Sequence, residues 1–259
     1  MKPEVSVIMS EYNTELNILK ASIESILNQT YTNFEFIIIN DGSSNNLENI
    51  VKKLNDERIL IINNEVNLGL PASLNKAIRN SKGDYLVRMD TDDVAHNKRI
   101  EVQLDFIKNN PQYSVVGTSI NLVTDGGMKT PKVREGEIDR NKLLNRNAPV
   151  HPSVIMNKKD IVDVGMYQNL RRGQDFALWA ELILANKKIY VLPDILLDYR
   201  VYLSDYKKRK LKNRLDEIKY RFIYYKKLKA NPMQFISIFK SVIAGILPGK
   251  IMAMYHKKS

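Results

Sequence analysis

The chain has 259 residues, of which 44% are hydrophobic and 27% charged, an ordinary globular composition that excludes wholesale disorder and collagen-like repeats. It contains no cysteine, so disulfides, thiolate metal sites and a cysteine nucleophile are excluded together. The longest apolar stretch, residues 241–247, is far shorter than the roughly 20 residues that a membrane-spanning helix needs.

The positive charge gathers at the C-terminal end. Residues 206–259 hold 15 lysines and arginines against two acids, a net charge of +13. Because the whole chain carries +11, the first 205 residues carry −2. A nucleic-acid enzyme more often spreads positive charge around its cleft. The sequence therefore predicts a near-neutral domain over residues 1–205 and a basic tail over residues 206–259 that meets an anionic partner.

Strand and helix patterns alternate through the first half of the chain. Apolar runs bounded by turn residues predict strands at residues 5–9, 34–39, 59–62 and 85–89. Apolar spacing predicts helices at residues 16–27, 46–54, 72–79 and 98–108, the first capped by Asn13 or Thr14. This alternation predicts an α/β fold in which helices cover both faces of a mostly parallel, Rossmann-like sheet.

The second half has a less regular pattern. Strands are expected at residues 113–116, 120–123 and 154–156, a polar loop at 125–137 and an amphipathic helix at 176–184. In parallel α/β sheets, ligands bind beyond the carboxyl ends of the strands. The polar residues that directly follow strands are therefore the candidates for chemistry.

Three carboxylates, Asp90, Asp92 and Asp93, lie within residues 88–93 (RMDTDD). Such groups repel one another unless a cation or hydrogen-bond donors offset the repulsion, and Mg²⁺ or Mn²⁺ prefers oxygen ligands. The alternative is a helix start, where acids complement the helix dipole. That alternative is expected to hold for Asp93 but explains Asp90 and Asp92 poorly, because they follow a buried strand.

Four further residues each allow a functional and a structural interpretation. Asp41 follows the second strand and could accept from a bound base or form an Asx turn. Asp175 precedes a helix and could be a general base or an N-cap. His151 could be a metal ligand, could contact an acceptor substrate or could be a core residue. Trp179 could be a core residue, or its indole face could stack on a sugar.

The order of these segments closely resembles glycosyltransferase family 2. The segments that match its nucleotide half are residues 6–9, 12–13, 40–43, 67–70, Asn75, 83–85 and 88–93. The segments that resemble the acceptor half of enzymes building bacterial O-antigen and capsule repeats are residues 151–156, 165–167 and 174–179. The resemblance covers about residues 5–199.

The resemblance implies a GT-A fold and an inverting transfer from a nucleotide-diphosphate sugar. By position, the donor pocket is expected to contain Ser10, Tyr12, Asn13, Asp41, Asn67, Arg88 and Asp90. Asp92 would bind Mn²⁺ or Mg²⁺, and Asp175 would be the catalytic base. His151 and Trp179 would contact the acceptor.

Three positions depart from the family pattern. The usual proline of the first-strand motif is replaced by Ser10-Glu11, and the usual Glu-Asp pair reads Gln174-Asp175. The Gln-x-x-Arg-Trp motif of processive members is absent after Asp175, which favours the addition of one sugar per encounter.

The reaction that the resemblance implies moves a hexose such as galactose or glucose from a UDP-linked donor to a lipid-diphosphate-linked saccharide. It would take place in the cytoplasm, at the inner face of a bacterial membrane. One alternative is a nucleotidyltransferase, but residues 10–13 lack the Gly-rich basic loop that usually opens such enzymes. The other is a non-catalytic nucleotide-sugar or membrane-binding module, against which the intact Asp90, Asp92 and Asp175 argue.

The basic tail has apolar residues at helical spacing. They form one stripe over residues 206–229, and residues 233–255 add a second apolar segment. This pattern predicts a peripheral segment that lies on an anionic membrane surface. The alternative is that the stripe packs on the catalytic domain. A nucleic-acid partner is not expected, because basic arms of that kind seldom carry so much aliphatic surface.

Overall fold

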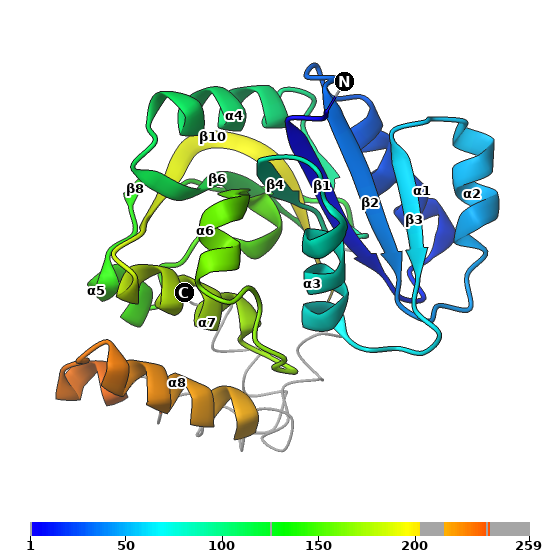
Figure 1. The fold of residues 1–259 in the computed structure, drawn as a ribbon. Helices are drawn as coiled ribbons and strands as arrows, with labels where there is room; N and C mark the ends of the chain where they lie inside the picture. Colours follow the sequence, from blue (N-terminus) through cyan, green and yellow to red (C-terminus); the bar gives the residue numbers. More distant parts are fainter. Residues whose placement is uncertain (1, 125, 203–214, 237, 239–259) are drawn as a thin grey trace.

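The computed structural model describes residues 2–124, 126–202, 215–236 and 238, and its centre is one mixed sheet (Figure 1). The strands are β1 (Val5–Glu11), β2 (Phe34–Asn40), β3 (Ile59–Asn63), β4 (Tyr85–Arg88), β5 (Val94–Ala95), β6 (Tyr113–Thr124), β7 (Lys129–Lys132), β8 (Gly136–Glu137), β9 (Ile155–Asn157) and β10 (Lys188–Val201). Their order is β3-β2-β1-β4-β9-β6-β10-β5, with β7 paired to β6 and β8 to β10.

Helices cover both faces of this sheet. They are α1 (Leu16–Leu27), α2 (Leu47–Leu54), α3 (Leu70–Asn80), α4 (Arg99–Asn109), α5 (Arg140–Leu144), α6 (Lys158–Asp163), α7 (Gln174–Leu184) and α8 (Leu215–Lys227), with a 3-10 turn at His151–Ser153. Strands β3, β2, β1 and β4 run parallel, whereas β9 is antiparallel to both β4 and β6. The α/β architecture is therefore the one that the sequence predicts.

Alternate side chains of the central strands pack into two separate hydrophobic cores, one on each face of the sheet. In β1, Val7 and Met9 pack with α1 and α4, whereas Ile8 between them packs with α3 and α7. Successive side chains of a strand point to opposite faces, so a strand covered on both sides must be apolar throughout. This explains the continuous apolar runs that mark β1 and β2 in the sequence.

The strands and helices predicted for the first half are all present, and three finer predictions need correction. Neither Asn13 nor Thr14 caps α1, because the side chain of Glu15 accepts from the backbone at its N-terminus. The polar loop expected at residues 125–137 contains β7 and β8. The two strands expected at 113–116 and 120–123 form the single strand β6.

The described part of the tail packs against α7. Figure 1 shows α8 beside α7. Tyr224 and Tyr225 on α8, together with Leu228 just after it, are buried in the same core as α7, while Phe222 on the outer side of α8 is 43% exposed. None of the helices in the described ranges combines the length and apolar character that a bilayer span needs. The rest of the stripe and most of the second apolar segment lie outside the described residues, so the division at residue 205 stays a prediction.

Candidate active site

A pocket of about 460 Å³ opens at the carboxyl end of β4. Its lining brings together residues that are far apart in the sequence: Arg88 at the end of β4 and Asp90 just after it, His151 before β9, Asp175 at the start of α7 and Tyr199 near the end of β10. The sequence analysis named the first four. Tyr199 was missed, because β10 was not predicted.

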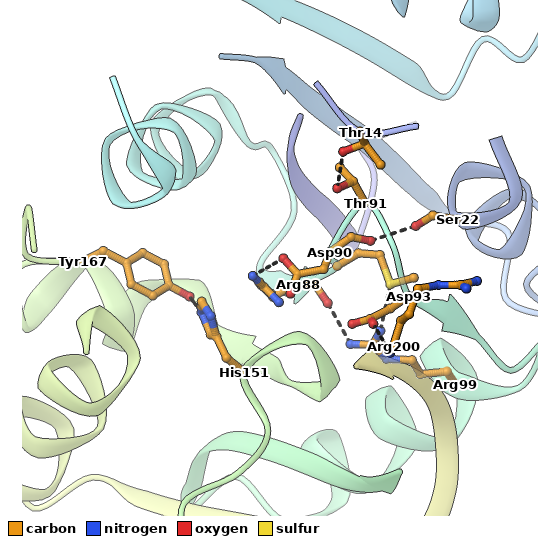
Figure 2. A network of polar contacts seen from close by, with 11 residues as sticks. Thr14, Ser22, Arg88, Asp90, Thr91, Asp93, Arg99, His151, Tyr167 and Arg200 are labelled. Carbon is orange, nitrogen blue, oxygen red and sulfur yellow. Dashed lines mark hydrogen bonds and ion pairs between the residues drawn. The ribbon is translucent and has the colours of Figure 1, made fainter. Parts of the chain in front are cut away.

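The loop of residues 90–93 is held from the N-terminal half of the chain (Figure 2). The Ser22 hydroxyl on α1 donates to the Asp90 carbonyl oxygen at 2.8 Å. The Thr14 hydroxyl donates to the Thr91 hydroxyl at 2.7 Å. These contacts fix the direction of the loop before any ligand arrives, which lowers the ordering cost of binding.

The three aspartates form a compact group in which one oxygen from each carboxylate lies within 4.8 Å of the other two. Burial and the neighbouring Asp90 raise the pKa of Asp92 to about 6. Burial, together with Asp90 and Asp92, also raises the pKa of Asp93 well above its ordinary value. A divalent cation between these oxygens would offset the repulsion, and carboxylates are the ligands that Mg²⁺ and Mn²⁺ prefer. The residues present therefore fit such an ion.

The expectation that Asp93 opens a helix is wrong. Asp93 is 1% exposed and precedes β5, and its Oδ1 accepts from the Arg200 backbone N–H at 2.9 Å (Figure 2). The Arg200 guanidinium also donates from Nε to the Asp92 carbonyl oxygen at 3.2 Å. Asp93 thus ties the acidic loop to the end of β10, a contact that local sequence patterns could not reveal.

Arg88 is buried beside the acidic loop. Its side chain is 2% exposed and forms an ion pair with Asp90, while Nε and Nη1 find no hydrogen-bond acceptor among the described residues. The Arg99 guanidinium donates to the Arg88 carbonyl oxygen at 2.8 Å and so fixes the backbone there. A buried cation with unused N–H groups at a pocket wall is suited to an anionic ligand, because unsatisfied buried donors are costly.

His151 lines the same pocket and is buried. Its Nε2 lies 2.8 Å from the Tyr167 hydroxyl, and burial together with the Arg88 charge lowers its pKa well below 6.5 (Figure 2). Trp179 packs edge-on against the His151 ring and has no exposed surface. The indole face of Trp179 is therefore part of the core and is not available for stacking on a sugar.

The donor-side candidates lie beyond β1 and β2. Tyr12 is 53% exposed, so its ring is free to stack on a base. Asp41 is 1% exposed, and its carboxylate accepts from the backbone N–H groups of Leu68 and Gly69, both at 2.9 Å. The Asn67 amide donates to the Asp41 carbonyl oxygen at 3.2 Å. In this arrangement, Asp41 holds the loop before α3 in place.

The turn after β1 is anchored by the residue that replaces the usual proline. Glu11 is fully buried, and its Oε1 accepts from the Thr14 backbone and from the Asn45 side chain at 3.0 and 2.9 Å. Asn13 adopts a positive φ of 53° and accepts from the Ser44 backbone N–H at 2.8 Å. Ser10, at the end of β1, is half-buried. Glu11 therefore joins the loops after β1 and β2, a role that the sequence analysis did not foresee.

Asp175 stands in the first turn of α7 and faces the pocket that also holds Asp90. The N-cap of α7 is Gly173, in the left-handed conformation, so the N-cap interpretation of Asp175 is wrong. A carboxylate facing a pocket that also contains a candidate metal loop is positioned to receive a proton from an attacking group.

Comparison with known proteins places this arrangement in a family. The sequence profile of glycosyl transferase family 2 matches residues 6–164. The chain belongs to glycosyl transferase family 2. An uncharacterised glycosyltransferase of Methanocaldococcus jannaschii is 36% identical over 223 residues, which cover 81% of this chain and 77% of that protein. The protein is therefore a glycosyltransferase, and the nucleotidyltransferase alternative is not supported.

Two relatives from Escherichia coli are each 28% identical. One is named a UDP-Gal:alpha-D-GlcNAc-diphosphoundecaprenol beta-1,3-galactosyltransferase, and the match covers 99% of this chain and 96% of that protein. The other is named a corresponding UDP-Glc glucosyltransferase, with 70% of each chain covered. The crystal structure of Staphylococcus aureus TarS with UDP has a TM-score of 0.68 at 18% identity, covering 94% of this chain and 70% of that chain, and supports the GT-A fold.

Proposed function

We propose that this glycosyltransferase moves a hexose, galactose or glucose, from a UDP-sugar to a saccharide linked to a lipid diphosphate, with inversion at the anomeric carbon. The observation that carries the proposal is that Asp90 and Asp175 line the same pocket. The names of the two Escherichia coli relatives supply the donor and acceptor classes.

On the donor side, Tyr12 would stack on the uracil, while Ser10 and Asn13 would lie along the base and ribose. Asp41 and Asn67 would shape this pocket, since their polar atoms hold the loop before α3. The exposure of Tyr12 supports the stacking role. Binding of the base at the carboxyl ends of β1 and β2 agrees with the general position of ligands in such sheets.

The diphosphate would lie over the loop of residues 90–93. Asp92 would bind Mn²⁺ or Mg²⁺, and a divalent cation there would stabilise the charge on the departing nucleoside diphosphate. The unused N–H groups of Arg88 would donate to the phosphate or to the sugar, while Asp90 keeps the guanidinium oriented through their ion pair.

Asp175 would act as the base on the acceptor side. The attacking hydroxyl must lose its proton as it bonds to the anomeric carbon, and one carboxylate at that face suffices. His151 is the less suitable proton acceptor, because burial lowers its pKa well below 6.5. We assign it a contact with the acceptor sugar through the pocket wall that it shares with Asp175.

The decisive experiment incubates the purified protein with a panel of UDP- and GDP-hexoses, Mn²⁺ and a GlcNAc-diphospho-lipid. Transfer of galactose or glucose from the UDP-sugar is expected. Asp92→Ala should abolish the stimulation by Mn²⁺, and Asp175→Asn should lose transfer while donor binding, measured by calorimetry, stays near wild type. Full activity in excess EDTA would contradict the role of the metal, and a largely active Asp175→Asn would move the base elsewhere.

We also propose that the tail holds the enzyme on an anionic membrane surface, where its acceptor resides. The outer side of α8 and the following turn supports this. Its exposed apolar residues are Phe222, Ile223, Met233 and Ile236, and its exposed lysines include Lys219, Lys226 and Lys229. Each cation near such a surface contributes roughly 1 kcal/mol. No nucleic acid is proposed as a partner.

Co-sedimentation with vesicles tests the membrane proposal. Full-length protein should bind anionic vesicles at low salt and be released at high salt. Removing residues 239–259, or changing Phe222 and Met233 to alanine, should weaken binding while transfer to a water-soluble acceptor changes little. If the full-length protein does not bind vesicles even at low salt, the proposal is wrong.

A further inference from the structure

Two cations in the pocket have no part in the roles given above. Lys132, the last residue of β7, and Arg134, two residues later, line the pocket together with Asp175. The donor-side residues follow β1, β2 and β4, whereas β7 pairs with β6, which lies beyond β9 in the sheet order. The two cations therefore stand on the side of the pocket away from the proposed nucleotide site.

The segment that carries these cations is held in place by specific contacts. The Arg134 backbone N–H donates to the Ser119 hydroxyl at 2.8 Å, and that hydroxyl donates back to the Arg134 carbonyl oxygen at 3.0 Å. The Arg134 Nη1 donates to the Ala148 carbonyl oxygen at 2.8 Å. At the start of β7, the Lys129 ammonium lies 2.5 Å from the Asp198 carboxylate on β10. These contacts keep the positive charge directed at the pocket.

The surroundings of the two cations are apolar. Ile120, Leu122 and Val150 line the pocket beside them. A ligand that suits this wall has at least two negative charges next to an apolar portion, and a diphosphate attached to a lipid has this composition.

We propose that Lys132 and Arg134 bind the diphosphate of the lipid-linked acceptor. The inference rests on the proposed function, because it presupposes a saccharide between that diphosphate and Asp175. Arginine and lysine form short, charge-assisted hydrogen bonds to phosphate oxygens. With the diphosphate held at this wall, the acceptor sugar extends toward Asp175 and the donor, so the two cations decide which sugar of the acceptor is presented.

The test compares two acceptors that carry the same sugar. One is GlcNAc linked to decyl diphosphate, and the other is the neutral decyl glycoside of GlcNAc. Lys132→Gln and Arg134→Gln should each lower kcat/KM for the diphosphate acceptor by about 10- to 100-fold, the range for a hydrogen bond to a charged group. The matched control is Lys52→Gln with Lys53→Gln, exposed positions on α2 at the far end of the sheet.

The expected pattern is a loss confined to the diphosphate acceptor, with the KM for the UDP-sugar and its slow hydrolysis unchanged. A raised donor KM would mean that the cations bind the donor diphosphate, and an equal loss with both acceptors would mean a structural role. Either result overturns the inference.

Binding of decyl diphosphate without donor, measured by calorimetry, should weaken in the double variant of residues 132 and 134 and not in the control; equal binding in both would also overturn it. If the wild type uses no UDP-sugar at all, the proposed function fails, and this binding measurement still decides the inference.

Discussion

Replacing Tyr225 with alanine should cost about 3–5 kcal/mol of the free energy of unfolding, the range for removing a buried aromatic side chain. Tyr225 has no exposed surface, and its ring lies 6.0 Å from that of Phe176 on α7. Its hydroxyl donates to the Leu144 carbonyl oxygen at 2.7 Å. A domain is typically stable by only about 5–15 kcal/mol, so this one change should remove a large share of the total.

Two further variants separate the contributions. Tyr225→Phe keeps the ring and removes the donor to Leu144, so it should cost about 1–3 kcal/mol, the penalty for an unsatisfied buried group. Phe222→Ala, on the outer side of the same helix, should cost less than about 1 kcal/mol because that ring is 43% exposed. The assay is urea unfolding followed by circular dichroism, compared at equal m-values.

The reasoning would be refuted if Tyr225→Ala were as mild as Phe222→Ala. Helix α8 would then not belong to the core of the domain, and its whole apolar stripe would be available to a membrane. With the expected result, the inner side of α8 belongs to the catalytic domain and the outer side is left to contact a membrane surface.

Two other residues give predictions of their own. Asp41→Asn removes one of two oxygens that accept from Leu68 and Gly69, so it should cost about 1–3 kcal/mol in urea unfolding and weaken UDP-sugar binding measured by calorimetry. The pKa of the buried His151 is lowered in the folded protein. Below pH 6.5, His151 therefore binds a proton in the unfolded chain but stays neutral in the folded one. Stability is thus fully present above pH 6.5 and should fall on acidification by up to about 1.4 kcal/mol per pH unit, and His151→Gln should flatten this fall. If Asp41→Asn bound the UDP-sugar as well as the wild type, the role of Asp41 would be contradicted. If His151→Gln lost stability with falling pH as steeply as the wild type, the role of His151 would be contradicted.

The first half of the fold was predictable because each strand is an apolar run that ends at a turn signal. Strand β10 was not, because Pro193 stands in its middle and proline argues against a central strand. The structure accommodates it with register shifts between Leu192 and Leu197 in the pairing with β6. Strand β6 was divided in the prediction at Gly117, a position where an added Cβ would lie 2.8 Å from the Cβ of Pro149. Glycine at this position lets the backbone of β6 pass close to Pro149, and it does not end the strand.

In the candidate site, the sequence indicated Asp90, Asp92 and Asp175, because carboxylates that follow strands or begin helices stand out locally. The predicted contact of Trp179 with a sugar does not fit the structure, because its ring has no exposed surface. The helical spacing of α7 does not show which of its side chains other elements will bury. Lys132 and Arg134 were overlooked inside a polar loop. Their alternate spacing, with Val133 between them, was the available signal that the segment is extended and directs both cations to one side.

The bond between Asp93 and Arg200 has a consequence for the order in which the protein acquires its chemistry. The two residues are 107 positions apart, and Arg200 lies outside the segment that the family profile matches. A chain still emerging from the ribosome therefore carries all three aspartates long before it contains the amide that fixes the last of them. Contacts this distant form late, after their loop-closure entropy has been overcome. The loop of residues 90–93 should thus acquire its final geometry only when β10 joins the sheet, so an incomplete chain should lack the arrangement that brings the three carboxylates together.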